Sequence, residues 1–171
     1  IPIKRNKNDQ WNVENSKYQP ILHLSSDKKD EALIWKRLQR KLLHYAGWPI
    51  LHYGETEFLS IYRLAKRQNA SKEELTELRN RFIDIHSRVK KFWCLPINNY
   101  GLKAVAKSMG FEWSKEGVDG PQALLWWRQW ERSRRSTKGY SKNLKSIFNY
   151  NRDDCLATWR ITDWLLQKKG N

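Results

Sequence analysis

The chain has 171 residues, enough for one ordinary domain with a hydrophobic core and too few for two. Its 33 Lys and Arg residues outweigh 18 Asp and Glu residues and give a net charge of +15. A charge this positive is typical of a protein with a polyanionic partner, most often nucleic acid, although a surface charged only for solubility is the alternative. No apolar run approaches the roughly 18–20 residues that span a bilayer. Two widely separated Cys residues favour a reducing, cytoplasmic setting over a disulfide framework.

The first half of the chain alternates short apolar runs with amphipathic stretches. After a polar segment, 1–19, that is irregular or hairpin-like, the pattern predicts strands over 20–24, 48–52 and 81–86 and helices over 28–45 and 55–67. Ser71 and Glu74 have the spacing of a capping box, which predicts a helix start. The strand, tight turn and helix around Gly54 are typical of an α/β protein.

The second half of the chain is richer in helical patterns. The sequence predicts a short helix over 100–109 and another that begins near Pro121. Residues 131–142 are basic and poor in apolar side chains, which favours a loop that contacts phosphate. A long helix containing residues 148–166 follows.

This last helix combines a core stripe with candidate functional side chains. Tyr150 and Asp154 are four residues apart and therefore share a helix face. A phenol and a carboxylate beside a buried seam suit a divalent metal and the water that it activates. Asp153 points about 100° away, so we expect it to face solvent or to cap. The core stripe itself is predicted to continue through Cys155, Trp159, Thr162 and Leu166.

Each candidate side chain also has a plain structural interpretation. Asp154 could be an exposed acid paired with Arg152 or Lys145, and Tyr150 an ordinary side chain at the edge of the core. We expect Asp84, at the end of a predicted strand, to cap the next turn. His52 is more typical of a hydrogen-bonded core histidine than of a ligand.

Three segments occur in an order that resembles a known family. They are His-Tyr-Gly-Glu-Thr-Glu at 52–57, Tyr-Gly-Leu-Lys-Ala-Val-Ala-Lys-Ser-Met-Gly at 100–110, continued by Phe-Glu-Trp, and Tyr-Asn-Arg-Asp-Asp at 150–154. Over about residues 20–168 the chain resembles the DnaQ-like (DEDD, tyrosine subtype) 3′→5′ exonuclease superfamily. Within it, the chain is most similar to the ribonuclease H-like domain attached to RecB-like predicted nucleases.

The resemblance implies a fold, a metal site and residue roles. It implies one ribonuclease H-like α/β domain over 1–171, with a central mixed sheet flanked by helices and a helix-rich C-terminal half. Four carboxylates would hold two Mg²⁺ or Mn²⁺ ions. Asp154 and Glu57 match metal ligands, with Glu55 as a competitor of Glu57, and Tyr150 matches the tyrosine that orients the attacking water.

The resemblance also implies which residues contact nucleic acid. These are His52, Tyr53, Lys103, Lys107, Arg134 and Arg135. The two lysines are equally consistent with a solvated helix face.

The first motif of the superfamily, Asp-x-Glu on an apolar strand, does not occur in the chain. The chain begins Ile1-Pro2 without Met, so we expect this strand to lie upstream of it. Two hypotheses follow. The chain is a metal-dependent 3′→5′ exonuclease domain acting on DNA or RNA, or it is a catalytically incomplete module that binds nucleic acid or a RecB-like nuclease or helicase.

Overall fold

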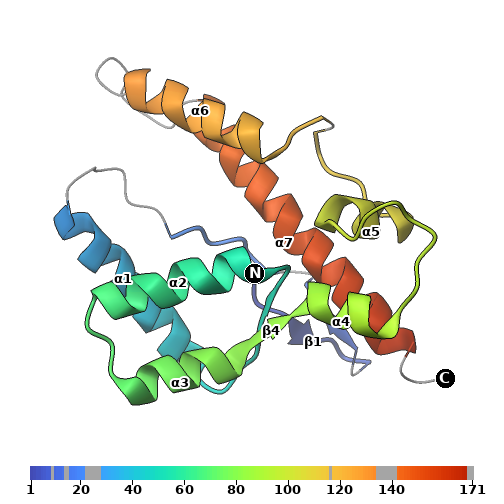
Figure 1. Ribbon diagram of the computed structural model, residues 1–171, viewed down its shortest axis with the longest axis horizontal. Coiled ribbons are helices and arrows are strands. Elements are labelled where there is room, and N and C mark those ends of the chain that lie inside the picture. Colours follow the sequence, from blue (N-terminus) through green and yellow to red (C-terminus); the bar gives the residue numbers. More distant parts are fainter. Residues whose placement is uncertain (9, 14–15, 22–27, 116, 134–141, 169–171) are drawn as a thin grey trace. The chain divides into compact units, whose positions relative to one another are not determined.

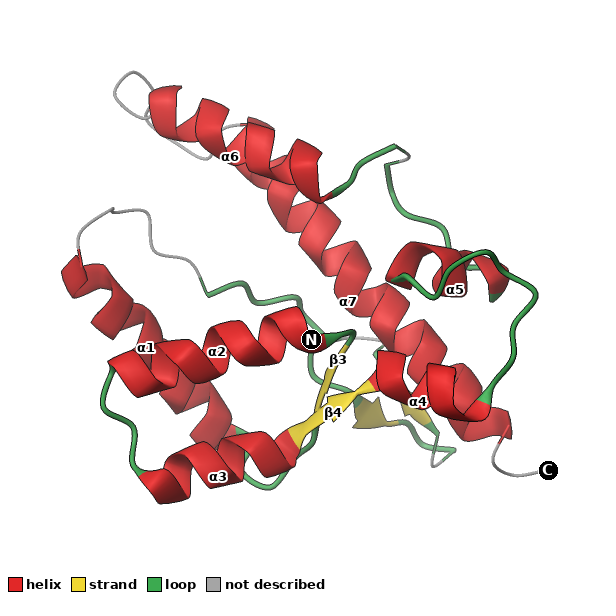
Figure 2. Cartoon of the chain, in the orientation of Figure 1, coloured by secondary structure: helices red, strands yellow, loops and turns green. Residues whose placement is uncertain are grey.

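Helices make up most of the part of the chain that the structure describes (Figures 1 and 2). The structure is a computed structural model that describes residues 1–8, 10–13, 16–21, 28–115, 117–133 and 142–168. In chain order its elements are β1 (Lys4–Arg5), β2 (Trp11–Asn12), α1 (Lys28–His44), β3 (Ile50–His52), α2 (Glu55–Arg67), α3 (Lys72–Arg81), β4 (Phe82–Asp84), α4 (Ile85–Phe92), α5 (Leu102–Ser108), α6 (Gly120–Ser133) and α7 (Lys142–Lys168). None of the described helices is long and apolar enough to cross a membrane.

The chain divides into two units. The middle unit is Gln19–Pro96, and the terminal unit joins Ile1–Tyr18 to Ile97–Asn171. The expectation of one domain over 1–171 stays a prediction.

The middle unit contains the predicted strand, turn and helix. Strands β3 and β4 pair in parallel, with His52 opposite Asp84. Gly54 follows β3 with φ of 85°, a left-handed conformation that favours glycine, and α2 begins at the next residue. The helices of this unit bury Trp35, Ala65 and Leu78, one side chain each from α1, α2 and α3.

Hydrogen bonds from polar side chains stabilise the start of α3 and the end of α1 in the middle unit. Ser71 and Glu74 form the predicted capping box at the start of α3. At the other end of α3, the buried Arg81 guanidinium donates to the backbone carbonyls of Leu42 at 3.0 Å, Tyr45 at 2.7 Å and Trp48 at 3.0 Å. Arg81 therefore satisfies carbonyl groups around the C-terminal end of α1 and the turn into β3.

The terminal unit is built on α7. Helices α5 and α6 both pack against it, and its own buried positions include Leu144, Ala157 and Ile161. Strands β1 and β2 pair antiparallel, which confirms a hairpin within the N-terminal segment.

Several sequence predictions are not matched by the residues that the structure describes. The described residues form two two-stranded sheets and no central mixed sheet. Strand β4 is shorter than the predicted 81–86 because α3 extends to Arg81 and α4 begins at Ile85. The predicted strand at 20–24 and its following cap lie largely outside the described residues.

The predicted core stripe of α7 is also displaced. Thr162 is buried as predicted, but Cys155 and Trp159 are half-buried and Leu166 is 47% exposed. The other buried positions are Ala157, Thr158 and Ile161. The burial follows the faces that α5 and α6 cover, and these neighbours cannot be identified from the periodicity of α7 alone.

Candidate functional site

Tyr150 and Asp154 lie together on one face of α7, as their spacing predicts. The Tyr150 hydroxyl donates a hydrogen bond to the Asp154 carboxylate. Trp113, in the segment after α5, donates its indole N–H to Asp154 Oδ1 at 2.9 Å. Lys103 of α5 completes the group, with its ammonium 5.5 Å from the Tyr150 ring centroid and 5.9 Å from that of Trp113. Three side chains, from α5, from the segment after it and from α7 itself, therefore surround the Asp154 carboxylate.

The two titratable members of this group have shifted pKa values. Burial raises the pKa of Asp154, although hydrogen bonds from Trp113 and Tyr150 and the charge of Lys103 act in the opposite direction. Burial, together with the nearby charge of Asp154, raises the pKa of Tyr150 to about 12. At neutral pH the phenol is therefore protonated, and the carboxylate lies in a site that favours a compensating positive charge.

Asp153 does not face solvent, which corrects the sequence-based expectation. It is only 4% exposed, and its Oδ2 accepts hydrogen bonds from the Ser114 backbone N–H at 2.9 Å and the Ser114 hydroxyl at 2.6 Å. Arg152 forms an ion pair with Oδ1 at 2.9 Å. Burial by itself would raise the pKa of Asp153, but the bonds from Ser114 and Arg152 outweigh it and lower that pKa. Asp153 is thus a structural carboxylate.

In the middle unit, Asp84 is likewise a structural carboxylate, because both of its oxygens accept hydrogen bonds that stabilise the fold. Its Oδ1 accepts the backbone N–H groups of Gly54 at 2.9 Å and His86 at 3.0 Å, and its Oδ2 accepts the Ser87 hydroxyl. Asp84 is therefore the N-cap of α4, as predicted, and also holds the β3–α2 turn. Burial opposes ionisation of Asp84, but these hydrogen bonds prevail and lower its pKa.

The residues from 52 to 57 are divided between buried and exposed positions. His52 is buried, with Nδ1 2.6 Å from the Gly54 carbonyl oxygen, so this nitrogen carries the proton and donates. Tyr53 is half-buried, contacts the His86 ring and has its pKa raised to about 12, first by burial and then by the charge of Asp84. Glu55 and Glu57 are both exposed on the first turn of α2.

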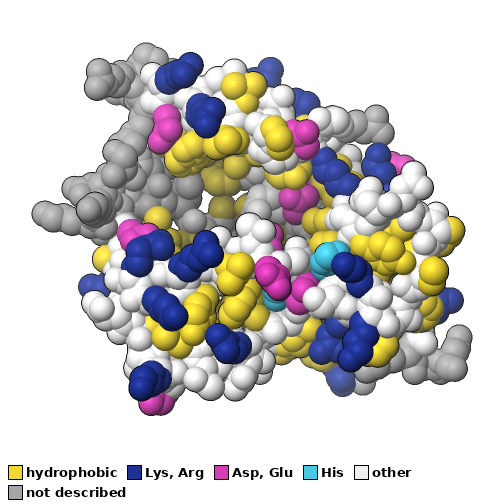
Figure 3. All heavy atoms as spheres, in the orientation of Figure 1, with side chains coloured by type: hydrophobic (Ala, Val, Ile, Leu, Met, Phe, Trp, Pro, Cys, Tyr) yellow, Lys and Arg dark blue, Asp and Glu magenta, His cyan; other side chains and the backbone are white. Residues whose placement is uncertain are grey.

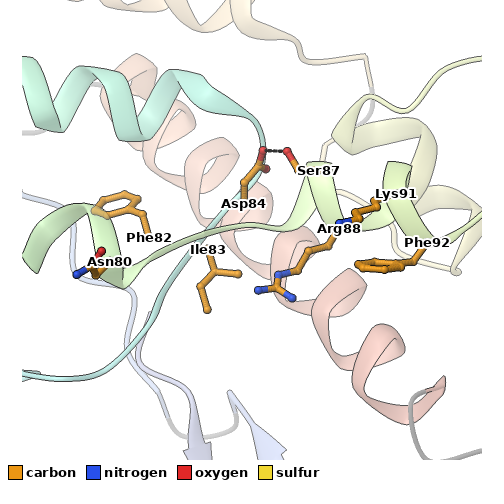
Figure 4. Close-up of a pocket in the computed structure, with 8 residues that line it drawn as sticks. All are labelled: Asn80, Phe82, Ile83, Asp84, Ser87, Arg88, Lys91 and Phe92. Atoms are coloured by element: carbon orange, nitrogen blue, oxygen red, sulfur yellow. Dashed lines mark hydrogen bonds between the residues drawn. The ribbon is translucent and has the colours of Figure 1, made fainter. Parts of the chain in front are cut away.

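A pocket of about 530 Å³ lies along β4 and α4 (Figure 4). Arg88 and Lys91 line it together with Phe92, whose ring is 63% exposed. Asp84 and Ser87 lie at its inner end, joined by their hydrogen bond. Two cations beside an exposed ring provide attraction for phosphate and a stacking surface.

The remaining candidates for nucleic-acid contact differ in their surroundings. Lys107 is exposed on α5, and Lys103 faces the aromatic rings of the Asp154 group. Arg134 and Arg135 lie outside the described residues. Lys and Arg side chains are spread over the face drawn in Figure 3, with hydrophobic side chains exposed between them.

The carboxylates differ in how well they fit a divalent metal. Asp153 and Asp84 have their oxygens occupied by strong local donors. Asp154 is desolvated and has no arginine partner among the described residues, and Glu57 is exposed with no hydrogen bond or ion pair to a described residue. These two carboxylates are therefore the ones suited to act as metal ligands. Among the described residues, neither unit by itself gathers three His, Cys, Asp or Glu side chains suited to one ion.

A comparison with known protein families gives a match that covers most of the chain. A profile of the RNase H superfamily matches residues 10–166. The chain therefore belongs to the RNase H superfamily. The comparisons with curated proteins and with solved structures gave no significant match.

Sequence reasoning missed the residues that surround the two acids of α7. Trp113 ends the Gly-Phe-x-Trp segment, so its motif was visible, but its bond to Asp154 depends on how the segment after α5 folds back. Ser114 carried no signal of its own, and Arg152, which the sequence offered as a partner of Asp154, pairs with Asp153 instead. The buried spacing of Asp153 with Ala157 and Ile161, each four residues on, was the available sign that Asp153 faces inward.

Proposed function

We propose that the chain is a metal-dependent nuclease domain that hydrolyses phosphodiester bonds of DNA or RNA in the 3′→5′ exonuclease manner. The observation that supports the proposal most is the Asp154 group: a desolvated carboxylate, bonded to a neutral phenol and an indole, with no arginine partner among the described residues. A half-buried carboxylate with a raised pKa and no arginine partner would gain from a bound cation.

The proposed roles of the residues follow from their chemistry. Asp154 and Glu57 would hold Mg²⁺ or Mn²⁺. The chemistry that these ions supply in such sites is activation of a water and neutralisation of charge on the phosphate oxygens. Tyr150 remains protonated at neutral pH, so its oxygen can accept a hydrogen bond from water while its O–H donates to Asp154. Tyr150 therefore orients a water rather than acting as a base.

The strand that is cut would be bound by the basic surface. In this proposal Lys103, Lys107, Arg134 and Arg135 contact phosphate, and Tyr53 contacts a base or sugar. His52 is buried and bonded to Gly54, so its contribution would be to hold the turn before Glu57. Association with a RecB-like nuclease or helicase stays a prediction, as does the cytoplasmic setting.

The test is metal-dependent release of nucleotides from a single strand labelled at its 5′ end. DNA and RNA strands are compared with Mg²⁺, with Mn²⁺ and with excess chelator, both for this chain and for any longer natural form that carries an Asp-x-Glu strand. A ladder shortening from the 3′ end is expected, and a circular strand should resist. Tyr150→Phe should lower the rate by about 100-fold, and Asp154→Asn should lower it further.

Asp163→Asn is the matched control, because Asp163 lies on the same helix within an ion pair with Arg160. It should leave the rate unchanged. Full activity of Asp154→Asn would disprove the site. Salt-sensitive binding without cleavage, in every form tested, would instead support the binding-module hypothesis.

A further inference from the structure

The carboxylate of Asp154 needs a fixed donor to keep one orientation. The last torsion of an Asp side chain joins an sp³ carbon to an sp² carbon and has broad minima, so the carboxylate rotates easily. Tyr150 donates to it from the preceding turn of α7, but a hydroxyl proton can rotate toward another acceptor. The indole N–H of Trp113, whose nitrogen lies 2.9 Å from Oδ1, has no such freedom and can only donate. Trp113 is therefore the donor that sets the orientation of Asp154.

Trp113 is itself held in place from several sides. It is only 9% exposed, and its ring stands edge-on to that of Phe111, with the centroids 4.9 Å apart and an interplanar angle of 87°. The next residue, Ser114, is bonded to Asp153 through both its backbone N–H and its hydroxyl. A donor that is packed in this way confines the carboxylate before any ligand arrives.

The face of the Trp113 ring has a second contact. The Lys103 ammonium lies 5.9 Å from the Trp113 ring centroid and 5.5 Å from that of Tyr150. A lysine that paired directly with Asp154 would compete with a metal ion for the carboxylate oxygens. The edge of the indole thus orients the acid, while its face gives the neighbouring cation a contact of its own.

We propose that Trp113 is a positioning residue that prepares Asp154 to bind a divalent metal ion. The inference rests on the proposed nuclease function and adds a residue that acts through Asp154. Without the indole N–H, the carboxylate would have to be ordered at the moment the ion binds. Hydrogen-bond partners of metal ligands typically account for about 10–100-fold in metal affinity or activity.

The experiment compares Trp113→Phe with Trp126→Phe, because both substitutions remove an indole N–H and keep an aromatic ring. Trp126 is also 9% exposed and also has an ammonium over its ring, that of Lys115 at 5.0 Å from the centroid. Unlike Trp113, it makes no hydrogen bond to an acid among the described residues. Thermal unfolding in chelator should therefore show similar losses of stability for the two variants.

Binding of Mn²⁺ alone is measured from the electron paramagnetic resonance signal of the free ion, without nucleic acid. This chain and any longer natural form that carries an Asp-x-Glu strand are both titrated. Trp113→Phe should weaken the affinity for Mn²⁺ by about tenfold, and Trp126→Phe should leave it unchanged.

The metal dependence of cleavage gives a readout that a purely structural role would not change. Trp113→Phe should need about tenfold more Mn²⁺ for half of its maximal rate, and excess Mn²⁺ should restore that rate, because the carboxylate is still present. Excess Mn²⁺ should not restore Asp154→Asn. Failure of Mn²⁺ to restore Trp113→Phe would count against the proposal.

If Trp113→Phe does not fold, the wild-type chain still tests the proposal. Nuclear magnetic resonance spectra of the ¹⁵N-labelled chain record the indole N–H groups of its 10 Trp residues. Addition of Mg²⁺ should shift the Trp113 signal more than the Trp126 signal, because the ion draws charge from the carboxylate that Trp113 contacts. Equal shifts of the two signals would contradict the assigned role.

Equal Mn²⁺ affinity of Trp113→Phe and wild type, or an equal loss of affinity in both Trp variants, would overturn the assignment of Trp113. Either result leaves the nuclease proposal intact if Asp154→Asn still slows formation of the 3′→5′ ladder. Absence of Mn²⁺ binding by every wild-type form would overturn both proposals.

Discussion

At the scale of single residues, the pKa values of two neighbouring acids on α7 are shifted in opposite directions. Asp153 is compensated by Ser114 and Arg152, so its pKa is lowered despite its burial. Asp154 has weaker partners, and burial raises its pKa. One acid therefore stabilises the fold when ionised, and the other costs stability when ionised, which is typical of a functional group.

Charge removal at these two positions should have opposite effects on stability at neutral pH. Because the pKa of Asp154 is raised in the folded protein, its protonated carboxyl contributes to folding stability. This contribution is complete below the pKa of an unfolded Asp, about 3.9, and is lost as the pH rises through the folded pKa. Asp154→Asn should therefore raise the melting temperature at pH 7, and this gain should shrink toward acid pH.

Asp153 should behave in the reverse way. The ionised carboxylate of Asp153 contributes to folding stability at any pH above the pKa of an unfolded Asp. That contribution is lost as the pH falls through the lowered pKa of Asp153 in the folded protein. Asp153→Asn should destabilise the protein at pH 7 by about 1–3 kcal/mol, because donors of Ser114 and Arg152 lose a charged acceptor. Thermal unfolding in metal-free buffer at pH 7 and at acid pH checks both variants. A gain for Asp153→Asn at pH 7 would contradict this account.

At the scale of secondary-structure elements, Arg81 links three of them. It ends α3, and its guanidinium satisfies carbonyls at the end of α1 and before β3. The sequence placed Arg81 at the start of a strand, where it would have no such role. Only the tertiary fold brings these carbonyl groups within hydrogen-bond distance of the Arg81 guanidinium.

Replacement of Arg81 should loosen the end of α1. Arg81→Met removes all three hydrogen bonds while keeping the apolar stem, so we expect a loss of about 1.5–3 kcal/mol. Arg63→Met is the matched control, since Arg63 is exposed on α2, and it should change stability by less than about 0.5 kcal/mol. Urea unfolding measures both. Hydrogen exchange should also show faster opening at residues 42–48 in Arg81→Met alone.

At the scale of the whole molecule, the net charge of +15 is the dominant physical property. It attracts a polyanion over long distances and makes binding sensitive to salt. The pocket beside α4 concentrates part of this charge, with Arg88 and Lys91 on one side of an exposed aromatic ring.

Binding of a single strand should weaken steeply as salt is raised. If Arg88 and Lys91 each contact a phosphate, replacing both with Ala should reduce the slope of log K against log salt by about 1.4, from roughly 0.7 per contact. Arg63→Ala removes one charge from α2 and should leave the slope unchanged. Anisotropy titrations between about 50 and 200 mM salt measure the slopes. A wild-type slope near zero would exclude phosphate binding as the purpose of the charge.

Local sequence determined much of the secondary structure. The helix over 55–67, the turn at Gly54, the capping box at Ser71 and the shared face of Tyr150 and Asp154 follow from spacing and backbone preference within a few residues. The order of the motifs also gave the resemblance to the ribonuclease H-like fold, whose superfamily the profile match shows.

Tertiary structure decided which side chains share an environment. Periodicity alone could not show that Leu166 is exposed, or that Trp113 and Ser114 bond to adjacent acids. These facts depend on contacts between residues about 40 positions apart, and no local pattern encodes such contacts. The direction of a carboxylate's pKa shift is set by the packed neighbours, which supply both its burial and its hydrogen bonds, rather than by the acid itself.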